Sequence, residues 1–131
     1  MTNFVMQDPP LQRVSRILFS EACGFGDSEF LSGLSEDERA LPHLVTPAFT
    51  AFLSNEFVRS FEGEGRNLRA ALAALESIAS LDDQDVDWLV CDAVFCTLKD
   101  ELKGFAALAA QFGPKTQRLY SRWIASNDRL K

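Results

Sequence analysis

The sequence has one histidine, three cysteines and no long apolar run, and each of these shortages excludes a class of protein. A single histidine, His43, cannot build a metal site from several imidazoles. No stretch approaches the ~18 consecutive apolar residues of a membrane helix, and the first ten residues lack the basic leader and apolar core of a signal peptide. We therefore expect a cytoplasmic protein that has no membrane partner.

The cysteines, Cys23, Cys91 and Cys96, are an odd number in a chain without an export signal. Such cysteines are typically reduced and packed as small hydrophobic side chains. Cys91 and Cys96 are five positions apart, which places them on different sides of a helix. We expect neither a zinc knuckle nor a redox pair.

Alternation of apolar and polar residues at period two is also missing, so no segment predicts a β-strand. Apolar residues recur at helical spacing instead, and the 131 residues, 47% of them hydrophobic with 11 phenylalanines, are sufficient for one core. The sequence predicts an all-α fold. We expect a single domain over residues 1–131, a compact bundle of about five to six helices.

Proline and glycine mark the expected helix ends. Asp8 and the prolines after it predict the start of the first helix, and residues 46–47 (Thr-Pro) predict another start. Residues 113–114 (Gly-Pro) predict a helix end, with Gly113 in the left-handed conformation, followed by the last helix. Between residues 24 and 45 the pattern is least regular. A short helix is expected there over residues 35–42, with Ser35 and Glu38 as a capping box.

Two apolar stripes are expected in the core. Four phenylalanines lie on one face of the helix after residues 46–47: Phe49, Phe52, Phe57 and Phe61. A later helix carries Trp88, Cys91 and Phe95 along a second apolar face. That face is either buried or a patch that binds a partner, and burial is the expected outcome because large exposed apolar patches are uncommon on monomers.

The segment LDDQDVDW, residues 81–88, could be a cation loop, an acidic contact surface or a helix start. An EF-hand loop beginning at Asp83 needs glycine at its sixth position and glutamate at its twelfth. Those positions hold Trp88 and Val94, which excludes calcium binding of this type.

A helix start explains most of the same segment. With Asp82 as N-cap, its carboxylate accepts from free amides of the first turn, and Leu81 and Val86 have the spacing of a hydrophobic staple. Asp87 and Asp92 have no structural task in this interpretation. They form either an acidic contact ridge or a solvated edge.

Catalytic motifs are absent. His43 could pair with Cys23 or an acid, but nothing flanks either residue as nucleophile motifs require. Residues 63–67 (GEGRN) offer free amides to an anion, yet no strand precedes them and the Walker lysine is missing. We expect no enzymatic activity, no cofactor and no metal.

Charge is distributed unevenly along the chain. Residues 1–98 contain 6 Lys and Arg against 16 Asp and Glu, a net charge of −10, whereas residues 99–131 contain 7 against 3, a net charge of +4. The acidic majority argues against a nucleic-acid ligand, which requires basic residues along the phosphates. A basic protein partner fits this charge better. The simpler alternative is an acidic surface that keeps the protein soluble.

Two resemblances bear on function. Residues 74–98, ALESIASLDDQDVDWLVCDAVFCTL, resemble a helical hairpin of the HEAT-repeat kind, in a single copy. Residues 66–124 combine a helix, an acidic turn with D-x-x-V, a long apolar helix and FGPKTQRLYSRW. This order resembles small helical bacterial immunity proteins encoded beside polymorphic or contact-dependent toxins. It implies a non-enzymatic protein that neutralises a cognate toxin by covering its active site or another surface that it needs.

The expected contact residues are acidic residues of the irregular segment and of the long helix, together with one tryptophan: Glu36, Asp37, Glu38, Asp83, Asp87, Trp88 and Asp92. A second hypothesis is a helical adaptor that binds a peptide or helix on the face of Trp88. A third is a small enzyme that uses His43. The position of Trp88, in the core or at the surface, separates the first two hypotheses from a purely structural role.

Overall fold

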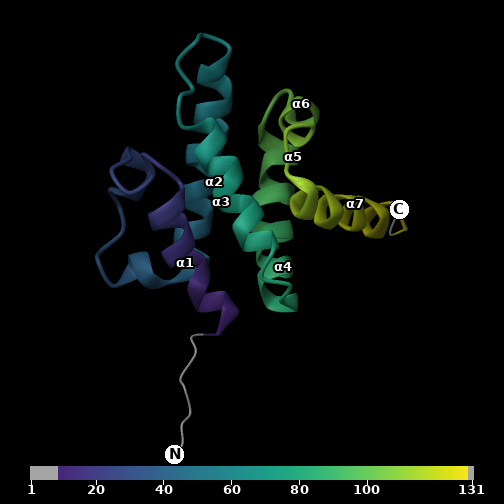
Figure 1. Cartoon of the computed structure of the whole chain (residues 1–131), viewed down its shortest axis with the longest axis horizontal. Coiled ribbons are helices and arrows are strands. Elements are labelled where there is room, and N and C mark those ends of the chain that lie inside the picture. The colour runs from purple at the N-terminus through teal and green to yellow at the C-terminus, as the bar shows by residue number, and fades with distance from the viewer. Residues whose placement is uncertain (1–8, 130–131) are drawn as a thin grey trace, which may run out of the picture.

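The computed structural model describes residues 9–129, with side chains through residue 126, as an all-helical molecule (Figure 1). No strand occurs among these residues, so the predicted all-α class is confirmed. The α-helices are α1 (Pro10–Glu21), α2 (Pro42–Ser60), α3 (Leu68–Ala79), α4 (Gln84–Val90), α5 (Thr97–Glu101), α6 (Phe105–Ala109) and α7 (Pro114–Arg129). Single 3-10 turns span Glu29–Leu31 and Glu38–Ala40.

Helices α4 and α5 belong to one continuous rod. The residues between them, Cys91–Cys96, wind as a π-helix, so that residues 84–101 run without a break; we call this element the 84–101 rod. The π segment is attached to α2, because the Thr50 hydroxyl donates to the Ala93 carbonyl at 2.8 Å. π-helical turns are rare and occur frequently at functional sites.

Helix α2 lies at the centre of the bundle. It packs against α1, α3, both 3-10 turns and the 84–101 rod, while α7 packs on α3 and on the π segment. Figure 1 shows α7 extending outward from the side of the bundle that carries the rod. None of the helices in the described chain is long and apolar enough to cross a membrane.

Aromatic rings form two clusters in the core. In the first, Phe25 is fully buried and its ring lies 5.5 to 5.7 Å from those of Phe19, Phe49 and Phe52. In the second, the buried Phe95 ring lies within 5.7 Å of the rings of Phe112, Tyr120 and Trp123. The second cluster fastens α7 to the rod, and each such aromatic pair contributes about 0.5–1.5 kcal/mol beyond area burial.

Helix α2 begins four residues earlier than predicted. It starts at Pro42 rather than at Thr46-Pro47, and Pro47 lies inside it. Pro47 has no amide to donate to the His43 carbonyl, one turn back. The earlier start buries Pro42 and Val45, and this apolar burial offsets the lost hydrogen bond.

Other predicted details have mixed outcomes. The Ser35–Glu38 capping box is confirmed, since each backbone amide donates to the other side chain, at 2.8 and 3.2 Å. Asp8 lies outside the described residues, and α1 begins at Pro10. The prediction that Phe61 is in the core is wrong: its side chain is 74% exposed at the end of α2, while Phe49, Phe52 and Phe57 are buried.

Gly113 does not adopt the predicted left-handed conformation. Among the described residues the left-handed glycines are Gly24, Gly63 and Gly104, and Gly104 forms the turn between the rod and α6. Gly113 is needed for a different reason. A Cβ atom there would lie 2.6 Å from a carboxylate oxygen of Glu76, so only glycine lets this carboxylate approach α7.

Candidate functional site: an exposed tryptophan on an acidic helix

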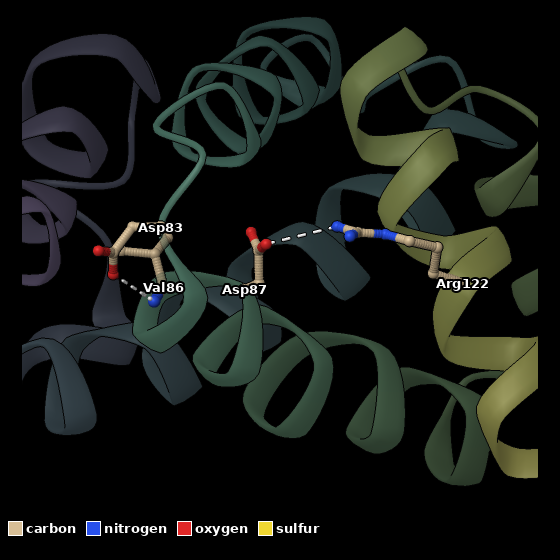
Figure 2. A network of polar contacts seen from close by, with 4 residues as sticks. All are labelled: Asp83, Val86, Asp87 and Arg122. Carbon is tan, nitrogen blue, oxygen red and sulfur yellow. Dashed lines mark hydrogen bonds and ion pairs between the residues drawn. The ribbon is translucent and has the colours of Figure 1, made fainter.

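The acidic turn starts α4 one residue later than predicted. Asp83 is the N-cap, and its carboxylate accepts a hydrogen bond from the Val86 amide at 3.1 Å (Figure 2). Asp82 has a left-handed backbone, φ +51°, which turns the chain out of α3, so it is not the N-cap and the Leu81–Val86 staple register is wrong. Asp83 therefore has a structural task and is half-buried.

Asp87 pairs within the molecule. Its carboxylate lies 3.4 Å from the Arg122 guanidinium, and Figure 2 shows this arginine reaching from α7 to α4. Burial raises the pKa of Asp87, and the Arg122 charge beside it offsets only part of that rise. The predicted contact residue Asp87 therefore links α4 to α7 within the molecule. Nothing in the sequence near Asp87 indicated Arg122 as its partner.

Trp88 lies at the surface. Its side chain is 64% exposed, while Phe95 is fully buried and Cys91 is half-buried. The expectation that this whole face is buried is therefore wrong. Because the helix winds more loosely from Cys91 onward, Phe95 turns away from Trp88 and into the cluster with Trp123.

A shallow groove of about 390 Å³ runs beside Trp88, between α4 and α7. Trp88 and Cys91 line it from the 84–101 rod, and Leu119 and Trp123 line it from α7. The Asp87–Arg122 pair also borders the groove. An apolar floor with charged groups at its edge is typical of binding surfaces that hold a partner side chain in a fixed orientation.

Two exposed carboxylates flank the tryptophan. Asp85 and Asp92 lie three positions before and four positions after Trp88, so the three side chains share one face of the rod. Both aspartates are exposed. The predicted contact residue Asp92 therefore lies beside Trp88, and Asp85 belongs to the same surface. We call Asp85, Trp88 and Asp92 the acidic tryptophan face.

The other predicted acidic residues lie on a different element. Glu36 and Asp37 are exposed, and Glu38 is occupied in the capping box with Ser35. Their turn packs against α1 and α2. The acidic residues expected to bind a partner thus form two groups on separate elements, and the group on the rod lies beside an exposed tryptophan.

Glu76 positions the second wall of the groove. Its carboxylate accepts hydrogen bonds from the backbone amides of Lys115 and Thr116, both at 2.9 Å, and from the Thr116 hydroxyl at 2.8 Å. Burial acts to raise the pKa of Glu76, but the hydrogen bonds from Thr116 and Lys115 outweigh it and lower the pKa. A residue of α3 thereby caps α7 from about 40 positions away in sequence, a contact that local patterns do not reveal.

Thiol and imidazole groups make no reactive constellation here. Burial raises the pKa of Cys91 to about 11, with the Asp87 charge adding to the effect, so this thiol is protonated at neutral pH. Cys23 and Cys96 are exposed free thiols, and His43 is exposed. Within residues 9–129 no group of three His, Cys, Asp or Glu side chains is arranged to hold a metal ion.

No protein-family model, curated protein or solved structure matches the chain. The resemblance to immunity proteins and to a HEAT hairpin therefore stays a prediction. Function has to be argued from the acidic tryptophan face itself.

Proposed function

We propose that this protein is a non-enzymatic binding protein that holds a basic segment of a partner protein on the acidic tryptophan face. The observation that carries the proposal is the 64% exposure of Trp88 between Asp85 and Asp92. Tryptophan is enriched among the few residues that dominate binding energy at protein interfaces. A tryptophan that is exposed between two carboxylates offers a suitable surface for a partner segment that is both apolar and positively charged.

The chemistry of the surface defines the partner segment. A lysine or arginine of the partner can lie over the indole ring, where a cation–π contact is worth about 0.5–2 kcal/mol, while its charge approaches Asp85 or Asp92. A neighbouring apolar side chain of the partner enters the groove between Trp88 and Trp123. The aspartates speed the encounter and select the sign of the partner's charge, and Trp88 supplies most of the affinity.

The resemblance to immunity proteins identifies the partner that we propose, a toxin domain. Toxins that act on nucleic acids need basic clefts to hold phosphates. An acidic protein with a net charge of −6 is steered toward such a cleft, and an anchored tryptophan keeps it there. Covering the cleft blocks the toxin without any chemical step.

A helical adaptor is the second candidate, favoured by the groove between α4 and α7. Its walls, Leu119 and Trp123 on one side and Cys91 on the other, suit the apolar face of a short helix. An adaptor of this kind binds a peptide from an unrelated protein, whereas an immunity protein binds a folded toxin domain.

The test is inhibition of the toxin encoded by a neighbouring gene. Excess wild-type protein is expected to abolish the toxin's activity in a purified assay and to protect cells that express it. Trp88→Ala should weaken inhibition by about 30-fold or more, the equivalent of about 2 kcal/mol. Phe61→Ala, which removes an exposed aromatic ring from α2, is the matched control and should inhibit normally. Full toxin activity in the presence of excess wild-type protein contradicts the proposal.

A further inference from the structure

Helix α2 is apolar on its outer face as well as on its inner face. Four of the five large hydrophobic side chains that are exposed in the described chain belong to α2 or to the residues at its ends: Leu41 (50%), Leu44 (40%), Val58 (49%) and Phe61 (74%). A helix that is apolar all round is normally covered on both sides. One side of α2 is covered by the bundle.

The outer residues follow a heptad pattern. The spacing of three and four positions alternates through six residues, Leu44, Pro47, Ala51, Ser54, Val58 and Phe61, which we call the α2 seam. The residues between them, such as Phe49, Phe52, Leu53 and Phe57, are buried in the protein's own core. This spacing is that of the a and d positions at which two helices pack as a coiled coil.

The α2 seam matches its own reversed copy. The seam is symmetric about the midpoint between Ala51 and Ser54. When the direction of the helix is reversed about this point, Ala51 takes the place of Ser54, Leu44 that of Phe61, and Pro47 that of Val58. In a dimer with a two-fold axis, residue i of one copy meets residue j of the other, and j meets i. An antiparallel pair of α2 helices would therefore join large apolar residues at both ends and small residues at the crossing, where the backbones must approach closely.

A groove in the surface extends this seam. Four seam residues, Pro47, Ala51, Ser54 and Val58, line a groove of about 520 Å³ between α2 and α5. Its other wall is formed by Thr97, Leu98 and, at the end of the rod, the exposed Glu101. A second helix that lies along α2 can thus place side chains against the rod as well as against the seam.

Charge favours a second copy of this chain as the occupant. Between Leu44 and Phe61 the charged residues are Glu56, which is buried and accepts a hydrogen bond from the Asn67 amide at 2.9 Å, and Arg59, which pairs with Glu64 at 3.5 Å. None of the six seam residues is charged, although the whole chain has a net charge of −6. A strongly charged partner finds no counter-charge on this seam, and two copies of an acidic chain repel each other least where they meet through uncharged faces.

We propose that this protein forms a symmetric homodimer through an antiparallel pair of α2 helices, with Leu44 of each copy against Phe61 of the other. The seam from Leu44 to Phe61 spans 17 steps of α2, about 25 Å, so the contact belongs to the smaller class of interfaces and dissociates on dilution. The dimer uses a face other than the acidic tryptophan face, and it does not depend on the function proposed for that face.

Sedimentation velocity of the full chain tests the dimer. From about 1 to 300 μM, the wild-type protein is expected to shift from a monomer of 14.6 kDa to a dimer. Leu44→Glu and Val58→Asp should each remain monomeric, with an unchanged helical circular dichroism spectrum because both positions are already exposed. Trp88→Ala removes the one large exposed hydrophobic side chain of the described residues that lies away from α2 and its two end residues, and it should leave the dimer intact.

A charge-pair experiment tests the register. Leu44→Glu and Phe61→Lys should each abolish dimerisation alone, and an equimolar mixture should form a mixed dimer. In that mixed dimer the introduced carboxylate faces the introduced ammonium in one layer, while native Leu44 and Phe61 meet in the other. A mixture that stays monomeric overturns the antiparallel register. A wild-type chain that is monomeric at about 300 μM, or a dimer that survives both Leu44→Glu and Val58→Asp, overturns the interface itself.

Discussion

The outer face of α2 and the acidic tryptophan face both expose large apolar side chains, yet their surroundings differ. No residue of the α2 seam is charged, and its neighbour Arg59 is paired with Glu64, whereas Trp88 lies between the exposed carboxylates of Asp85 and Asp92. Where an exposed apolar surface binds a partner, the charge around it selects the kind of partner. By this criterion the seam suits a second copy of the chain, and the acidic tryptophan face suits a basic partner.

Phe95→Ala should have the largest effect on stability and would disturb one face only. Phe95 is fully buried against Phe112, Tyr120 and Trp123, which fasten α7 beside Trp88. Loss of this ring is expected to lower the free energy of unfolding by about 3–5 kcal/mol. Urea denaturation followed by circular dichroism measures it. Any protein that stays folded should still dimerise through α2. A loss below 1 kcal/mol would show that the cluster does not hold α7.

Trp88→Ala should lower partner affinity by about 2 kcal/mol or more and change the free energy of unfolding by less than about 0.5 kcal/mol. Phe95 and Trp88 are seven residues apart on the same rod, but only Phe95 is in the core. Thermal denaturation of the two variants side by side makes the comparison. Destabilisation by Trp88→Ala as large as that by Phe95→Ala would place Trp88 in the core and remove it from any interface.

Glu76→Gln should cost about 1–3 kcal/mol because the glutamine cannot accept all three hydrogen bonds at the start of α7 with the strength of a charged carboxylate. The pKa of Glu76 is lowered in the folded protein. The stabilisation is therefore present above the unfolded-state pKa and is lost as pH falls through the folded-state pKa.

The difference in unfolding free energy between wild type and Glu76→Gln should thus shrink below about pH 4. Because α7 is a wall of the groove, partner binding should weaken in parallel while dimerisation through α2 does not change. A difference that stays constant from pH 7 to pH 3 would contradict the charged cap.

Asp87→Asn should have the smallest effect, within about 1 kcal/mol in either direction. The variant loses an ion pair whose arginine is largely exposed, and such pairs contribute little. The folded-state pKa of Asp87 is raised, so the folded protein favours the protonated form of this side chain. The resulting stabilisation is fully present below the unfolded-state pKa and is lost as pH rises through the folded-state pKa. Removing the charge should therefore flatten the pH dependence near pH 4 to 5, which pH-dependent urea denaturation can detect. A loss of more than 2 kcal/mol at pH 7 would show that the pair is structurally essential.

Local patterns predicted much of the fold because apolar residues recur at a clear helical spacing in the sequence. The capping box at Ser35 and the start of the last helix at Pro114 are confirmed, and the apolar stripes are confirmed except at Phe61 and Trp88, which are exposed. The Asp82 N-cap was wrong by one position. Adjacent aspartates have equal capping chemistry, and the left-handed turn at Asp82 depends on how α3 and α4 meet.

The candidate site could be predicted only in part for a similar reason. Trp88, Asp87 and Asp92 were predicted from the sequence, but the separation of the exposed Trp88 from the buried Phe95 follows the π segment, which the spacing of apolar residues does not reveal. Glu76 and Arg122 act across about 35 to 40 positions, where spacing carries no information. The outer seam of α2 was hidden by the phenylalanines of its buried face, which led us to expect the exposed Phe61 in the core.

Calorimetric titration of the toxin domain that we propose as partner into wild type, Trp88→Ala and Phe61→Ala tests most directly that partner binding belongs to the acidic tryptophan face and not to α2. We predict saturable binding by wild type and by Phe61→Ala, weaker binding at high salt, and an affinity at least about 30-fold lower for Trp88→Ala. Equal affinities for wild type and Trp88→Ala, or a loss confined to Phe61→Ala, would contradict the assignment of partner binding to the acidic tryptophan face.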